Sequence, residues 1–179
     1  MNYATVKTHD VANGPGVRVS LFVSGCTHRC KGCFNAEAWD FDYGEPFTKE
    51  VEDEIIEALA PSYIKGFSLL GGEPFEPCNQ RVLVGLLERI RATYPQKTVW
   101  CYSGYDFERD MLSHRLGDAD VTDRMLRSID VLVDGEFIEE QKDLALRFRG
   151  SANQRIIDVP RSLESGKIVL RPEMCNDKK

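Results

Sequence analysis

Residues 16–34 read GVRVSLFVSGCTHRCKGCF, an apolar run that passes directly into a loop containing three cysteines. Large apolar residues at every second position of the run predict a strand with one face in the core: Val17, Val19, Leu21 and Val23. Phe22 lies among them and indicates that the opposite face is buried as well. Burial on both faces is typical of an inner strand of a covered sheet, so this stretch predicts an inner strand that ends at the cysteine loop.

Other segments alternate between helical and strand patterns. Apolar residues recur every three or four positions in 47–60 and 79–94, which predicts two amphipathic helices. Apolar runs predict further strands at 66–70, 97–104 and 130–135, with weaker ones at 154–159 and 167–170. The alternation predicts an α/β fold with a mainly parallel sheet of five or six strands. Because a closed barrel of this kind needs eight strands and ~250 residues, we expect an open, partial (βα) barrel.

The least ordinary sequence follows the ends of the predicted strands. The cysteine loop comes after the first strand, and the later strands end at Gly71-Gly72-Glu73-Pro74, Ser103-Gly104 and Asp134-Gly135. Open α/β sheets bind their ligands beyond the carboxyl ends of the strands. We therefore expect four strand tips to converge on one site.

The overall composition restricts the class of protein. The 179 residues suit one domain, and no apolar run approaches the ~18 residues of a membrane span. The N-terminus lacks a basic start followed by an apolar block, so we expect no signal peptide, no membrane partner and a cytoplasmic location. The net charge of −6, without a cluster of Lys or Arg, argues against nucleic acid as a partner. Uneven cysteine spacing in a chain of this size argues against a disulfide framework.

The spacing of Cys26, Cys30 and Cys33 leaves three interpretations open. With His28 the thiols could complete a structural zinc site, although His28 is two residues from both Cys26 and Cys30 and would be cramped in one tetrahedron. The thiols could carry no metal, but the glycines and charged residues around them are poor core sequence. Soft thiolates at close spacing favour an iron–sulfur cluster, and three ligands on a [4Fe-4S] cluster would leave one iron open.

The same spacing resembles the signature of radical S-adenosylmethionine (SAM) enzymes. Residues 13–35, NGPGVRVSLFVSGCTHRCKGCFN, are similar to the N-terminal signature of the enzymes that activate glycyl-radical proteins. Three further segments narrow the resemblance to the family that activates anaerobic ribonucleoside-triphosphate reductase: WCYSGY (100–105), VDGEF (133–137) and FRGSANQR (148–155). The resemblance covers residues 1–160 as an activating domain with a radical SAM type of barrel, and leaves 161–179 as a C-terminal extension of unknown role.

The resemblance implies a role for each strand tip. Cys26, Cys30 and Cys33 would hold a [4Fe-4S] cluster whose open iron binds the amino and carboxylate groups of SAM. The positions implied as cofactor contacts are Gly32, Cys33, Phe34, Gly71, Gly72, Glu73, Ser103 and Asp134. Residues 71–73 would receive the amino group, and residues 32–34 would lie near the adenine, although many radical SAM enzymes have an aromatic residue where this chain has Gly32. Ser103 and Asp134 would hold a cation or polar groups beside SAM.

The resemblance also implies a reaction. The cluster would cleave SAM reductively, with an electron from a donor such as flavodoxin, and the 5′-deoxyadenosyl radical would take hydrogen from a glycine in a loop of the large reductase subunit. No catalytic residue is implied beyond the cluster ligands. The alternatives are an activating enzyme of another glycyl-radical enzyme, such as pyruvate formate-lyase, and a small-molecule radical SAM enzyme, such as a deazaguanine synthase. A non-catalytic iron–sulfur electron carrier and a zinc-bound interaction module belong to other classes.

Overall fold

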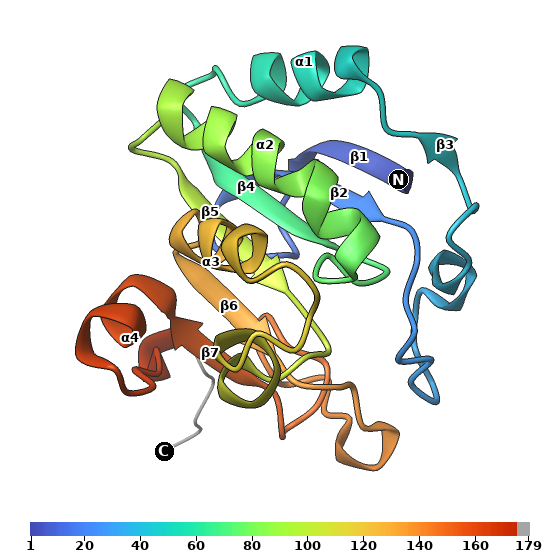
Figure 1. The fold of residues 1–179 in the computed structure, drawn as a ribbon, viewed down its shortest axis with the longest axis vertical. Helices are drawn as coiled ribbons and strands as arrows, with labels where there is room; N and C mark the ends of the chain where they lie inside the picture. Colours follow the sequence, from blue (N-terminus) through green and yellow to red (C-terminus); the bar gives the residue numbers. More distant parts are fainter. Residues whose placement is uncertain (175–179) are drawn as a thin grey trace.

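A seven-stranded sheet runs through residues 1–174, the part of the chain that this computed structural model describes (Figure 1). Its strands are β1 (Asn2–Asp10), β2 (Val17–Val23), β3 (Glu45–Pro46), β4 (Ile64–Gly71), β5 (Thr98–Tyr102), β6 (Val131–Asp134) and β7 (Arg155–Asp158). The α-helices are α1 (Lys49–Ala58), α2 (Pro77–Thr93), α3 (Ala119–Arg127) and α4 (Val159–Ser165). Short helical turns occupy η1 (Ala36–Trp39), η2 (Phe107–Leu112), η3 (Glu139–Gln141) and η4 (Pro172–Met174).

The strand order confirms the α/β class and corrects the strand count. The order is β3-β1-β2-β4-β5-β6-β7, with parallel pairing from β2 through β4 and β5 to β6. The outer strands β1, β3 and β7 pair antiparallel with their neighbours, so the sheet is mixed and parallel only in its middle. The expectation of five or six strands was wrong: the described residues form seven.

Two features explain the wrong count. Strand β1 has no buried apolar stripe, because its only buried residue is the acidic Asp10, and β3 is two residues long. Apolar periodicity, which reports burial, therefore gave no signal for either strand. The expected strand at 167–170 contributes only an isolated bridge between Ile157 and Leu170.

Helices α1, α2 and α3 cover one face of the sheet (Figure 1). Alternate strand residues point into this core, including Val19, Leu21, Phe67, Leu69, Val99 and Leu132. The opposite face carries a smaller apolar cluster of Trp100, Val131, Val133 and Ile156. Phe22 is buried too, so the expectation that β2 is buried on both faces is confirmed.

Arg18 lies fully buried in β2 and ties three segments together. Its guanidinium donates to Ser68 Oγ (2.7 Å) and to the carbonyl oxygens of Phe67 (2.7 Å) and Thr98 (2.9 Å). Burial lowers the pKa of Arg18 to about 10. Ser68 Oγ in turn donates to the carbonyl of Asn13 (2.5 Å), so this cation anchors the loop that joins β1 to β2.

The end of the described chain packs on the sheet. Helix α4 begins at the buried Val159, and Arg171 forms an ion pair with Asp158 (2.9 Å). Residues 161–171 of the expected extension therefore contact the domain, whereas Cys175 lies outside the described residues. Within residues 1–174, no helix has the length and apolar character needed to cross a membrane.

Candidate functional site

A cavity of about 440 Å³ lies at the ends of the parallel strands. The sequence-predicted residues that line it are Cys26, Cys30, Gly32, Cys33, Phe34, Gly71, Gly72, Glu73 and Ser103. Of the predicted positions, only Asp134 is not among the lining residues. Three of the four predicted strand tips therefore present those side chains to one cavity, and the fourth contributes Gly135 to its wall.

The cysteine loop is folded back on the turn that follows it. Gly25 N donates to Ala38 O (2.8 Å), and Cys26 N donates to Trp39 O (3.1 Å). Gly32 has φ +73°, a left-handed conformation that glycine adopts without cost, between the second and third cysteines. The start of the loop is therefore held to the following turn by bonds within the protein, and Cys33 N donates to Cys30 O (3.1 Å) further along it.

The three thiols fit an iron–sulfur cluster. Cys26, Cys30 and Cys33 are unpaired, and Cys26 is buried while the other two are partly exposed. Burial, with a smaller effect of the Glu73 carboxylate, raises the pKa of Cys26 to about 12, and burial also raises that of Cys30. The protein alone therefore does not favour the thiolate forms of Cys26 and Cys30, so binding of iron at these two would release protons. A set of three soft donors on one cavity suits iron and sulfide better than hard cations.

The two glycines of the 71–74 turn bring that turn against the cysteine loop. Gly72 N donates to Val23 O (2.6 Å), and Glu73 N donates to Gly25 O (2.8 Å). A Cβ on Gly72 would lie 2.6 Å from Gly25 O, and Gly71 has φ +115°. The close approach that these glycines permit is therefore to the chain's own backbone, and it joins the two loops that line the cavity.

Glu73 is a buried carboxylate with its hydrogen bonds made inside the protein. It accepts from Ser103 Oγ (2.8 Å), Gly104 N (2.7 Å) and Phe75 N (2.8 Å), and its side chain is 1% exposed. Ser103 is thus placed beside Glu73 by a direct hydrogen bond. This carboxylate connects the tip of β4 to the tip of β5.

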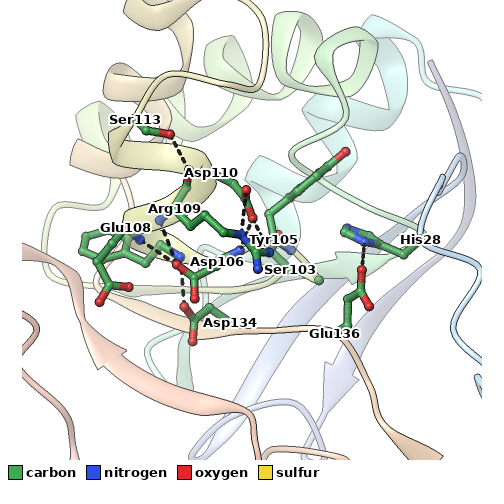
Figure 2. Close-up of polar contacts among 12 residues, drawn as sticks. His28, Ser103, Tyr105, Asp106, Glu108, Arg109, Asp110, Ser113, Asp134 and Glu136 are labelled. Atoms are coloured by element: carbon green, nitrogen blue, oxygen red, sulfur yellow. Dashed lines mark hydrogen bonds and ion pairs between the residues drawn. The ribbon is translucent and has the colours of Figure 1, made fainter.

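His28 joins the cysteine loop to two carboxylates, an arrangement that the sequence did not predict. Its Nδ1 lies 3.0 Å from Glu136 Oε1, a contact drawn as a dashed line in Figure 2. Its Nε2 lies 3.2 Å from Glu73 Oε2, too poorly aligned for a hydrogen bond. Burial lowers the pKa of His28, but the carboxylates of Glu73 and Glu136 outweigh it and raise the pKa to about 9. Because both ring nitrogens face acids, His28 does not complete the zinc site that the spacing left open.

Asp134 belongs to a neighbouring polar cluster. Its carboxylate accepts from Phe107 N (3.0 Å) and from Arg155 Nε (2.9 Å), and Arg155 also contacts Asp106 and Glu108. Figure 2 shows Asp134, Asp106 and Glu108 together, apart from the pair of His28 and Glu136. The guanidinium occupies the position among these three carboxylates that a cation could otherwise take.

Other lining residues come from segments whose role the sequence left unassigned. Phe148, Arg149 and Gln154 of the FRGSANQR segment line the cavity, and so do Asn13 and Tyr102. The Tyr102 hydroxyl is buried without a hydrogen-bond partner among the described residues. All of these residues lie in segments that carry the family resemblance, but no spacing pattern indicated that they line one cavity, because they meet only in the folded chain.

Comparison with known proteins agrees with this arrangement. A family model described as a 4Fe-4S single cluster domain matches residues 12–157, so the chain belongs to the proteins that carry one such iron–sulfur cluster. The chain is 45% identical over 159 residues to a protein of Vibrio cholerae, which covers 87% of this chain and 97% of the relative. It is 44% identical over 156 residues to an Escherichia coli protein (86% and 96%) and 38% identical over 159 residues to one of Enterobacteria phage T4 (87% and 93%).

All three relatives are named anaerobic ribonucleoside-triphosphate reductase-activating protein. At this identity and coverage, the chain belongs to the family of anaerobic ribonucleoside-triphosphate reductase-activating proteins.

Proposed function

We propose that this chain is a radical SAM enzyme that generates the glycyl radical of anaerobic ribonucleoside-triphosphate reductase. Family membership supports the target, and the single-cluster 4Fe-4S match supports the iron–sulfur cofactor. The observation that carries the proposal is the meeting of three unpaired cysteines and the 71–74 turn at one cavity. The open, partial barrel is part of the proposal, because it would leave this cavity accessible to a protein segment.

The proposed cluster ligands are Cys26, Cys30 and Cys33, which leave one iron for SAM. When bound, the cluster and SAM supply the one-electron cleavage and the radical that abstracts hydrogen. The chain's own residues place these groups: the backbone at Gly71 and Gly72 presses the 71–74 turn against the cysteine loop. Glu73 accepts a hydrogen bond from Ser103 and so joins that turn to the tip of β5.

The proposed SAM contacts are Gly32, Cys33, Phe34, Gly71, Gly72, Glu73 and Ser103, which all line the cavity. A contact of Asp134 with SAM or a cation stays a prediction, since its carboxylate pairs with Arg155. We also propose flavodoxin or a similar one-electron donor, and a domain of residues 1–160 followed by an extension.

Anaerobic reconstitution tests the proposal. Reduced protein with iron and sulfide should convert SAM to 5′-deoxyadenosine and, with the reductase present, give a glycyl radical signal in electron paramagnetic resonance. Replacing Cys26, Cys30 or Cys33 with Ala should abolish both products and lower bound iron, whereas Cys78→Ala, an exposed cysteine outside the cavity, should leave them unchanged. Colourless, iron-free protein would indicate the zinc module instead, and SAM cleavage without a radical in the reductase would indicate another substrate.

A further inference from the structure

The three most exposed large hydrophobic side chains of residues 1–174 gather at the cavity. Leu144 is 91% exposed, Phe34 85% and Val11 71%, whereas the next, Tyr63, is 53% exposed. Phe34 and Leu144 line the cavity, and Val11 directly precedes Ala12 and Asn13, which line it too. Single exposed apolar residues are ordinary on any protein, but the three extreme cases around one cavity indicate an interaction surface.

Each of the three side chains sits on a segment that the protein holds in place. Next to Val11, Asp10 accepts from Ala12 N (2.8 Å) and Asn13 Nδ2 (2.6 Å). Phe34 follows Cys33 on the cysteine loop, and Cys33 N donates to Cys30 O (3.1 Å). The loop that carries Leu144 is closed by a bridge between Lys142 and Ser151. The apolar rim of Val11, Phe34 and Leu144 is therefore built from three anchored loops.

Several charged groups beside the rim have partners within the protein, although Lys142 also lines the cavity. Lys31, near Phe34 in the chain, pairs with Glu139 (2.9 Å), and Asp143, next to Leu144, accepts from Ala145 N (2.8 Å). The Arg147 guanidinium lies over the Phe148 ring, 5.3 Å from its centroid. Because these groups are engaged, a partner at the rim gains most by burying apolar surface rather than by supplying charge.

We propose that the apolar rim docks the glycine-bearing segment of the reductase, an inference that rests on the proposed function. The rim is continuous with the cavity wall, so a chain held there has its tip at the proposed site of chemistry. A glycine at the tip has no side chain to fill the cavity, so its affinity must come from flanking residues. The segment should therefore carry uncharged, apolar side chains on both sides of the glycine, which cover Val11, Phe34 and Leu144.

The test compares two double variants, one that removes exposed apolar side chains at the rim and one that removes the next most exposed apolar side chains elsewhere. Val11→Ser with Leu144→Ser removes two rim residues and leaves Phe34, beside a proposed cluster ligand, intact. Tyr63→Ser with Leu170→Ser is the matched control, because these side chains are 53% and 50% exposed and line no part of the cavity. The measurements are iron content, 5′-deoxyadenosine formed without reductase, the dissociation constant for the reductase, and the yield of glycyl radical.

The rim variant should bind the reductase about a hundredfold more weakly and lose glycyl radical at limiting reductase, because each of the two side chains removed contributes about tenfold when buried. Its iron content and reductase-free SAM cleavage should stay within twofold of wild type, as should all four values of the control. Unchanged binding of the reductase by the rim variant, or an equal loss of binding in the control, would overturn the proposal that the rim docks the reductase. So would a wild-type dimer, seen by sedimentation, that the rim variant dissociates, since a second copy would then cover it. If wild-type protein gives no radical at all, the proposed function fails and the rim assignment falls with it.

Discussion

Gly72→Ala tests whether the contact between the 71–74 turn and the cysteine loop requires a residue without a side chain. The new Cβ would lie 2.6 Å from Gly25 O and 2.8 Å from Ala38 O, both backbone atoms that cannot rotate away. Relief of this overlap must lengthen the hydrogen bonds from Gly72 N to Val23 O and from Glu73 N to Gly25 O. Two such bonds contribute about 2 kcal/mol and overpacking costs about 2 kcal/mol more, so we expect a loss of about 4 kcal/mol.

A loss of this size is a large part of the stability of a domain, which is about 5–15 kcal/mol. Urea unfolding of the iron-free, reduced protein measures it, and a fall of about 10 °C in the melting temperature should accompany it. Gly85→Ala is the matched control, since Gly85 lies in α2 and its Cβ would meet nothing within 4 Å. We expect the control to gain about 0.5–1 kcal/mol. A Gly72→Ala protein within about 0.5 kcal/mol of wild type, an ordinary surface-substitution effect, would refute the steric argument.

Three further substitutions probe the polar groups around the cavity. Glu73→Gln should lower the free energy of unfolding by about 3 kcal/mol in urea titrations, because the new amide places N–H groups against buried donors such as Gly104 N. The control is Glu57→Gln at an exposed position, and a loss at Glu73 no larger than the loss in this control would contradict the argument. Arg155→Met should cost about 3 kcal/mol, measured the same way, by leaving the buried Asp134 without its cation, and a neutral effect would show that this ion pair is not needed. Burial raises the pKa of Asp10, but hydrogen bonds from neighbours including Ser20 outweigh it and lower the pKa. The contribution of the Asp10 carboxylate to the free energy of unfolding is therefore present above pH ~4 and is lost as the pH falls through the pKa of the folded protein. Asp10→Asn should therefore cost about 1–2 kcal/mol at pH 7 and progressively less below pH ~4, and a gap that is independent of pH would disprove this.

The convergence of the strand tips was predictable because it follows from local patterns. Apolar periodicity located β2, β4, β5 and β6, and parallel pairing brings the carboxyl ends of such strands to one edge. Cys26, Gly72 and Ser103 therefore had to lie near one another, and all three line the cavity. Strand β1, which pairs with β2 and β3, was not predictable, because its polar residues pair through their backbone and leave no apolar stripe to recognise.

The partners of the charged side chains were not predictable from spacing. Asp134 ends β6 as expected, but it pairs with Arg155 of the adjacent strand β7 and so does not line the cavity. The position of His28 between Cys26 and Cys30 made it a candidate fourth metal ligand. In the structure its ring lies between Glu73 and Glu136, which are 45 and 108 residues away along the chain. Such pairs depend on which strands become neighbours in the sheet. No short stretch of the sequence shows which strands these will be.

The amino-acid sequence by itself determined the spacing of Cys26, Cys30 and Cys33 and the class of cofactor that this spacing predicts, because three close cysteines can hold one cluster wherever their loop lies in the fold. The sequence also determined the positions of the inner strands, since alternating apolar residues indicate a buried strand face. Only the tertiary structure decided that the glycines of the 71–74 turn meet the chain's own backbone, and that the exposed Phe34 and Leu144 line one cavity together with Ala12, the neighbour of Val11. These contacts join segments far apart in the chain, so they exist only once the sheet order and loop packing are set.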